Sequence, residues 1–177
     1  MPAFAFTPDA LTLSVGLLAA RLVLGLLMAA HGSQKLFGWF GGYGLAGTGG
    51  FFESIGFRPG KRFAALAALT EVGSGLLIAL GFLGPVGPAL MLSVMIVAAV
   101  SVHLQHRLFA ASNGIEVPLL YGIGAFALAL TGPGIFSLDA LLGLNAVWTP
   151  TASLVALAVG IAGGFGNLAL RRPAPVA

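Results

Sequence analysis

Long apolar runs with very few charged residues occupy most of this sequence of 177 residues. Charged residues make up 7% of the chain, whereas a soluble domain carries roughly a quarter. An α-helix of about 20 apolar residues crosses the hydrocarbon core of a bilayer. The runs occupy residues 11–33, 63–82, 88–107, 116–131 and 151–170. They predict an all-α fold, a transmembrane helical bundle with four core helices and a fifth C-terminal span.

The segment between the first two runs, residues 38–60, is rich in glycine and aromatic residues. Backbone broken by glycine is unstable against lipid tails, but an aromatic segment suits the membrane interface. We expect a short interfacial helix here, with Thr48 as its N-cap and its end near Ile55. The whole chain, residues 1–177, is expected to form a single membrane domain.

All basic residues except one lie at the expected ends of spans. They follow the first, third and fifth runs, at Lys35, Arg58, Lys61, Arg62, Arg107, Arg171 and Arg172. Because positive residues favour the cytoplasmic side, we expect an integral protein of a bacterial-type inner membrane, with its N-terminus outside and its C-terminus in the cytoplasm. No Lys or Arg precedes the first run, which predicts a retained span rather than a cleaved signal. These positions explain the net charge of +3, so we expect lipid rather than nucleic acid as partner.

The remaining basic residue, Arg21, lies inside the first run, and Glu71 lies near the centre of the second. An isolated charge at mid-bilayer costs roughly 3 kcal/mol on insertion scales, so we predict that Arg21 and Glu71 lie at similar depth and pair. The pair is either a structural link between two spans or part of a polar cavity in which Glu71 exchanges a proton or holds a substrate. Helical periodicity places five residues on one stripe of the first span, namely Arg21, Gly25, Met28, Gly32 and Lys35.

A second group of polar residues gathers at the expected cytoplasmic end, comprising His31, Lys35, His103, His106, Arg107 and Glu116. Such side chains could bind an anion or the ring oxygens of a quinone and pass protons to a redox carrier. In the structural alternative, Lys35 and Arg107 extend to lipid headgroups while Glu116 stabilises the start of the fourth span. The candidate catalytic residues are Glu71, His31 and Glu116, and the candidate substrate-binding residues are Arg21, Lys35, Glu71, His103, Glu116 and Tyr121.

The absence of cysteine excludes disulfides, iron–sulfur clusters and thiol catalysis. His103 and His106 are three residues apart, a spacing that can share a metal, but carboxylates are few nearby and we predict no metal site. The glycine runs follow no expected strand and lack the spacing of a dinucleotide site.

Several of these residues occur together in a pattern comprising Arg21, His31-Gly32 with Lys35, Glu71, Glu116, and the Gly-Pro-Gly-Ile-Phe-Ser-Leu-Asp segment at 132–139. In these features the chain resembles the DoxX family of small membrane proteins over roughly residues 19–142. The resemblance implies a four-helix membrane bundle associated with quinone-dependent respiration, sulfur oxidation and oxidative-stress complexes. The apolar segment after Trp148 departs from the family pattern.

The leading functional hypothesis is a quinone-linked redox membrane component that acts with partner subunits. Arg21 and Lys35 would then be charge partners, and a bound quinone or a partner's cofactor would carry the electrons, since we expect no intrinsic cofactor. The alternatives are a non-enzymatic scaffold that docks soluble redox enzymes through residues 39–57, and a small transporter whose buried pair lines a pathway. Enzymatic activity and homo-oligomerisation stay open.

Overall fold

The computed structural model describes residues 9–172. Its main helices are α1 (Ala10–Phe37), α2 (Gly44–Ser54), α3 (Gly60–Leu80), α4 (Val86–Ala98), α5 (Glu116–Thr131), α6 (Leu138–Leu141) and α7 (Pro150–Ala169). Short 3-10 turns lie at Trp39–Gly41, Ala110–Ser112 and Leu144–Val147, and a π-helical turn at Ala99–His103 followed by a 3-10 turn at Leu104–His106 continues α4. The described residues contain no strand, which confirms the all-α prediction.

Within the described part of the chain, four helices are long and apolar enough to cross a membrane. They are α1, α3, α4 with its continuation to His106, and α7. The remaining apolar helix, α5, is shorter at 16 residues. The five predicted spans therefore all correspond to helices. The end of the first span differs from the prediction, because α1 continues to Phe37 rather than ending near residue 33.

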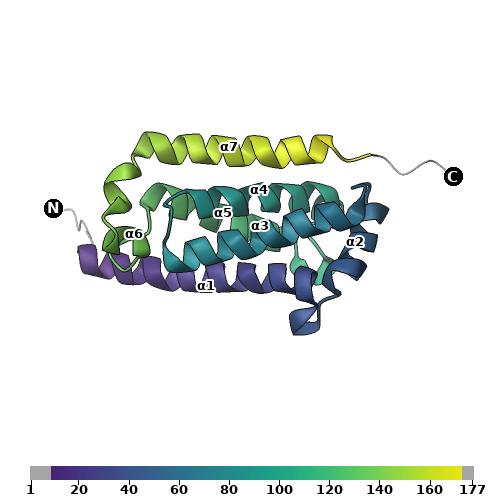
Figure 1. Ribbon diagram of the computed structural model, residues 1–177, viewed down its shortest axis with the longest axis horizontal. Helices are drawn as coiled ribbons and strands as arrows, with labels where there is room; N and C mark the ends of the chain where they lie inside the picture. The colour runs from purple at the N-terminus through teal and green to yellow at the C-terminus, as the bar shows by residue number, and fades with distance from the viewer. Residues whose placement is uncertain (1–8, 173–177) are drawn as a thin grey trace, which may run out of the picture.

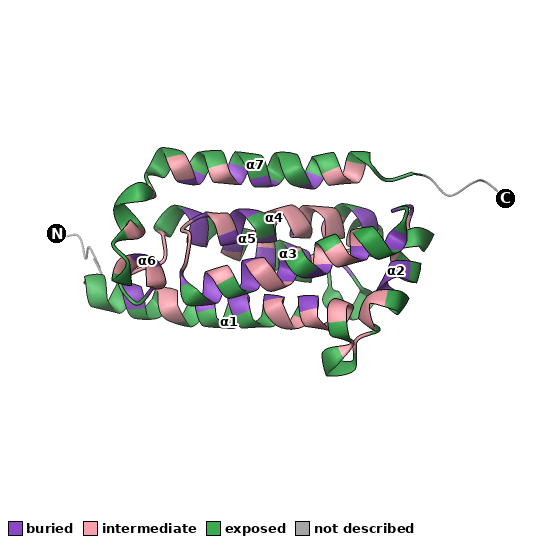
Figure 2. Cartoon of the chain, viewed as in Figure 1, coloured by how far each residue is buried: buried purple, intermediate pink, exposed green. Residues whose placement is uncertain are grey.

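The long helices lie side by side, with α1 and α7 on opposite sides of the bundle (Figure 1). Figure 2 shows that the exposed residues lie on the outward faces of the helices. Many of them are large apolar residues, as expected for surfaces that face lipid tails. The buried core lies between α1, α3, α4 and α5 and consists of Met28, Ile78, Met91, Met95, Tyr121, Ala125 and Leu128.

Glycine residues set the register between α1 and α3, which pack closely and run antiparallel. A Cβ atom at Gly25 would lie 2.6 Å from the carbonyl oxygen of Gly75, and one at Gly32 would lie 2.6 Å from that of Ala68. Such distances leave no room for a side chain, so the helix backbones touch directly. Four residues of the predicted stripe on the first span, Arg21, Gly25, Met28 and Gly32, are buried, and the fifth, Lys35, is half-buried.

Replacing Gly25 with leucine is expected to force α1 and α3 apart and to lower the free energy of unfolding by about 3 kcal/mol, the upper range for overpacked cores. Denaturant unfolding of the purified protein in detergent measures this loss. Gly16→Leu is the matched control, because a Cβ at Gly16 meets no atom within 4 Å. Equal stability of the two variants would contradict the close approach of the helices.

The helix α7 packs on α4 in the same way. The backbone of Gly160 approaches the Ala89 carbonyl, and a Cβ at Gly164 would lie 3.0 Å from the carbonyl oxygen of Ser93. These two glycines are four residues apart and therefore lie on one face of α7. The fifth predicted span is thus a packed part of the bundle.

The segment 38–60 forms the expected short helix, α2, but its predicted N-cap is wrong. Helix α2 begins at Gly44, and Thr48 is buried inside it rather than capping it. The chain turns earlier than expected because Gly38 and Phe40 adopt left-handed φ angles of 76° and 51°. These residues end α1 and redirect the backbone, so that α2 starts before the threonine is reached.

Candidate functional site

Glu71 pairs with Lys35 and not with Arg21, so the predicted Arg21–Glu71 ion pair is wrong. The Lys35 Nζ atom lies 2.6 Å from each carboxylate oxygen of Glu71. The Glu71 side chain is 4% exposed and that of Lys35 is 29% exposed. The pair therefore joins a buried carboxylate to an ammonium group that reaches the surface, through short charge-assisted hydrogen bonds.

The register of α1 and α3 explains this choice of partner. In the antiparallel packing set by the glycines, Arg21 lies beside the last turn of α3. Glu71 lies seven residues before Ile78, whose carbonyl Arg21 binds, which corresponds to about 10 Å along the helix axis. The sequence-based depth was counted from the end of each span separately, and α1 with 28 residues is longer than α3 with 21. Because the two helices differ in length, equal residue counts from their ends do not place two residues at the same depth in the membrane.

Arg21 instead binds backbone carbonyl groups. Its guanidinium donates to the oxygens of Ile78 at 3.1 Å, Ala79 at 3.2 Å and Phe136 at 2.8 Å, and also to that of Pro133. Two of these carbonyls belong to the last turn of α3, where the helix dipole favours a cation. Arg21 therefore links the end of α3 to the loop after α5.

Asp139 holds the adjacent turn and attracts Arg21 electrostatically. Its fully buried carboxylate accepts hydrogen bonds from the N–H groups of Leu83 at 2.9 Å and Gly84 at 2.6 Å. Ser137 caps α6, accepting from the N–H of Ala140 at 3.1 Å. We call Arg21 and Asp139, with the backbone groups they bind, the Arg21 network. The network gives Arg21 a structural role, while substrate binding by Arg21 stays a prediction.

Helix α5 adds an aromatic contact to α1 one helical turn before Lys35. The rings of His31 and Tyr121 meet edge to face with centroids 5.9 Å apart. Tyr121 is buried in the core between α1, α3, α4 and α5. His31, Lys35, Glu71 and Tyr121, which we call the Glu71 cluster, thus come from three helices and include four of the predicted site residues.

The other predicted polar residues bind within the α4–α5 connection. The Nδ1 atom of His103 lies 2.8 Å from the carbonyl oxygen of Asn113, and that of His106 lies 2.7 Å from the carbonyl oxygen of Val102. Glu116 accepts a 2.7 Å hydrogen bond from the N–H of Ala110. The group predicted at this end is therefore divided between the Glu71 cluster and a hydrogen-bonded loop. No group of three or more metal-ligating side chains occurs among the residues that the structure describes.

A cavity of about 600 Å³ lies between the C-terminal end of α1 and α2. Such a volume is typical of sites for small organic ligands. Its walls are formed by aromatic rings, by glycine backbone and by the polar side chains of Gln34, Lys35 and Thr48. The other residues that line it are Gly41, Gly42, Tyr43, Gly47, Phe51 and Phe52. Because Lys35 lines the cavity and also binds Glu71, it connects the cavity to the Glu71 cluster.

Sequence reasoning missed this cavity. The glycine and aromatic residues of segment 38–60 are the sequence signal for this cavity, but the same composition also indicates a segment at the membrane interface. The cavity depends on the sharp turn between α1 and α2, where the Gln34 side chain donates to the Phe40 carbonyl at 3.1 Å. Left-handed φ angles at non-glycine residues such as Phe40 are uncommon, so a sequence pattern does not predict them.

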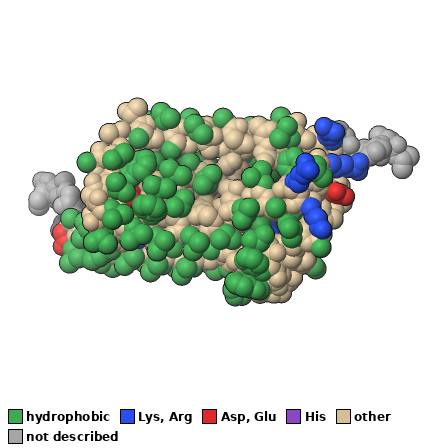
Figure 3. Space-filling view, in the orientation of Figure 1, with side chains coloured by type: hydrophobic (Ala, Val, Ile, Leu, Met, Phe, Trp, Pro, Cys, Tyr) green, Lys and Arg blue, Asp and Glu red, His purple; other side chains and the backbone are tan. Residues whose placement is uncertain are grey.

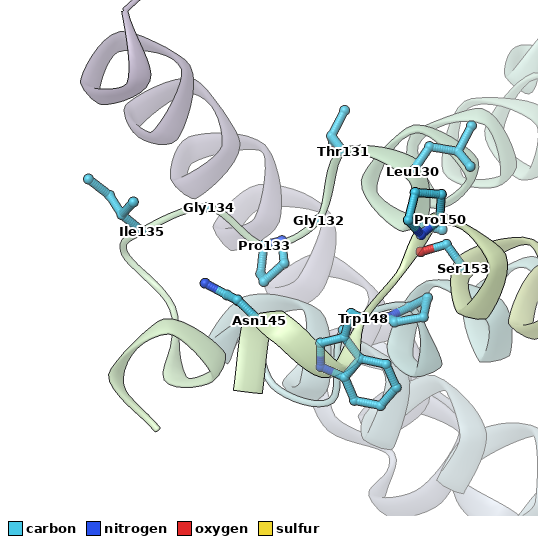
Figure 4. A pocket seen from close by; sticks show the side chains of 13 residues that line it. Leu130, Thr131, Gly132, Pro133, Gly134, Ile135, Asn145, Trp148, Pro150 and Ser153 are labelled. Carbon is cyan, nitrogen blue, oxygen red and sulfur yellow. The ribbon is translucent and has the colours of Figure 1, made fainter. Parts of the chain in front are cut away.

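A second cavity, of about 310 Å³, lies at the other end of the bundle between the loop after α5 and the start of α7 (Figure 4). Pro133, Asn145, Trp148 and Ser153 contribute to its walls. The described residues that line it include no ionisable side chain, so it offers no proton donor or charge. The cavity at Lys35 is therefore the stronger candidate for chemistry.

Comparisons with known proteins agree with this architecture. The DoxX family profile matches residues 16–104, from the first turns of α1 to the end of α4. Inner membrane protein YqjF of Escherichia coli (strain K12) is 32% identical over 134 residues, which cover 76% of this chain and 95% of that protein. No solved structure matches the chain at a significant level. The matched region contains Arg21, Lys35 and Glu71.

Proposed function

Since the chain belongs to the DoxX family and is an integral inner-membrane protein, we propose that it is a quinone-linked redox component that acts with partner subunits. The observation that supports this proposal is that Lys35, the ion-pair partner of the buried Glu71, lines the 600 Å³ cavity. Lys35 offers a hydrogen-bond donor to a ligand in that cavity, and the buried carboxylate of Glu71 lies directly behind it as its ion-pair partner.

The residues of the cavity fit a quinone headgroup. Lys35 would donate a hydrogen bond to a ring oxygen, and the flat ring would lie among Tyr43, Phe51 and Phe52. When bound, a quinone supplies electron and proton transfer at its two ring oxygens. Electrons would come from or go to a partner subunit.

The Glu71 cluster would handle the protons. Lys35 can lose a proton to Glu71 or receive one from it through their 2.6 Å hydrogen bonds. The exposed His31 lies one helical turn before Lys35 on α1 and contacts the buried Tyr121. This arrangement would connect the buried carboxylate to the surface of the bundle at a histidine, a side chain that can both accept and donate a proton.

The orientation of the bundle is part of the proposal. Lys and Arg side chains gather at the end near α2 (Figure 3), which the positive-inside rule assigns to the cytoplasm. The cavity between α1 and α2 lies at the same end (Figure 1), so it would open toward the cytoplasmic leaflet. A soluble redox partner on that side could dock on the exposed rings of Trp39, Phe40 and Tyr43, which is the second candidate function.

Replacing both Lys35 and Glu71 is expected to weaken quinone binding by about 10- to 100-fold, which corresponds to the loss of one charge-assisted hydrogen bond. The double variant Lys35→Met with Glu71→Gln avoids leaving a buried charge unpaired. Equilibrium binding of a radiolabelled short-chain quinone to the detergent-solubilised protein measures the effect. Lys61→Met is the control, because it removes an exposed lysine that does not line the cavity. Unchanged affinity in the double variant would reject the cavity as the quinone site.

A further inference from the structure

A groove lies between α3 and α7 on the face of the bundle where both helices pack against α4. Its volume is about 210 Å³, and Leu66, Leu90 and Val97 form much of its apolar wall. Helix α7 approaches α4 through its glycines, and this close packing leaves α7 apart from α3. The groove therefore opens toward the lipid rather than into the protein core.

One end of the groove adjoins a basic surface that two distant segments form together. The backbone N–H of Arg172 donates to the carbonyl of Gly56 at 2.8 Å, and the Arg171 guanidinium donates to the carbonyl of Ile55 at 2.5 Å. These bonds hold the end of α7 against the turn between α2 and α3. Five exposed basic residues meet there, which we call the basic cluster: Arg58, Lys61, Arg62, Arg171 and Arg172.

The groove and the basic cluster are continuous. Phe63 lines the groove and directly follows Arg62. Asn167 also lines the groove and lies one helical turn before Arg171. Figure 3 shows Lys and Arg side chains at the end of the molecule where α2 and the C-terminal end of α7 meet. Glu53, the acidic residue of this turn, accepts a 3.0 Å hydrogen bond from the Gly60 N–H.

We propose that this combined surface binds an anionic phospholipid, with an acyl chain in the groove and the phosphate on the basic cluster. Arginine binds phosphate through paired, planar N–H groups, and clustered basic residues next to a membrane attract anionic lipids. A zwitterionic lipid fills the groove equally well but leaves the cluster without a net counter-charge. Charge complementarity therefore selects the occupant. The proposal does not depend on quinone binding, although Phe52 lines both the groove and the cavity at Lys35.

The first test compares two lipids with identical acyl chains. The full-length protein in mild detergent is mixed with equal amounts of phosphatidylglycerol and phosphatidylcholine, and retained lipid is counted by native mass spectrometry. The native protein is expected to prefer phosphatidylglycerol. The double variant Arg62→Gln with Arg172→Gln is expected to lower that preference by about tenfold, and it keeps the backbone bond of Arg172. Equal retention of both lipids by the native protein overturns the proposal.

The second test fills the groove. A Cβ at Gly163 meets the Ser93 hydroxyl at 3.5 Å, an ordinary contact, so Gly163→Leu adds a side chain at the groove without displacing backbone. Gly166→Leu is the matched control on the same helix, because a Cβ at Gly166 meets nothing within 4 Å. Gly163→Leu is expected to lower retention of both lipids several-fold relative to Gly166→Leu. Equal retention by the two variants overturns the acyl-chain part of the proposal. The arginine variant tests the headgroup part whether or not Gly163→Leu folds.

Discussion

Replacing Arg21 with methionine is expected to lower the free energy of unfolding by about 3–5 kcal/mol, the range for removing one partner of a buried charged network. The substitution removes the side-chain donor from four backbone carbonyls, of which that of Ile78 keeps the N–H of Gly81, and it leaves Asp139 without its nearby cation. Denaturant unfolding in detergent, followed by helical circular dichroism, measures the loss.

Two controls separate this network from a general effect of charge. Arg21→Lys keeps the charge but replaces a planar donor array with a single ammonium group, so an intermediate loss is expected. Arg107→Met removes an exposed arginine from the loop after α4 and should change stability by less than about 0.5 kcal/mol. If Arg21→Met were as stable as Arg107→Met, the Arg21 network would not hold this end of the bundle together.

The positions of the helices could be predicted from the sequence because bilayer thickness fixes the length of an apolar run. The buried stripe on α1 could be predicted for a similar reason, since helical periodicity places its residues on one face. Both are local properties. A count of consecutive residues is enough to find them.

The partner of Glu71 could not be predicted in this way, because it depends on how α1 and α3 slide against each other. Direct backbone contact at Gly25 and Gly32 sets that register, and the sequence shows the glycines without showing which residues they meet. The partners of Arg21 could not be predicted either. Its partners are backbone carbonyls, which every residue carries, so no side-chain pattern identifies them.

The polar residues of the site could be predicted from the sequence, whereas the cavity beside them could not. Lys35, His31 and Glu71 were recognised as polar residues in an apolar context, and Lys35 and Glu71 do meet. The cavity beside them was missed because it is built by a turn whose left-handed residues include Phe40. Prediction therefore identified the chemistry of the site better than its shape.

The two members of the Lys35–Glu71 pair are expected to contribute unequally to stability. Lys35→Met leaves a carboxylate that is 4% exposed without its cation, and the expected loss is about 3 kcal/mol. Glu71→Gln leaves an ammonium group that is 29% exposed and can extend toward water, so a loss of about 1 kcal/mol or less is expected. Denaturant unfolding of both single variants and the double variant completes the thermodynamic cycle.

The same cycle separates a structural pair from a functional one. If the pair serves folding alone, the double variant should recover most of the stability lost in Lys35→Met and should bind quinone as the native protein does. If the pair serves the cavity, Glu71→Gln should stay folded and keep Lys35 as a ligand, yet lose the buried carboxylate that exchanges protons. Quinone binding would then persist in Glu71→Gln while quinone-dependent turnover with the native partner subunits falls. Equal stability losses in the two single variants would contradict the asymmetric burial on which this argument rests.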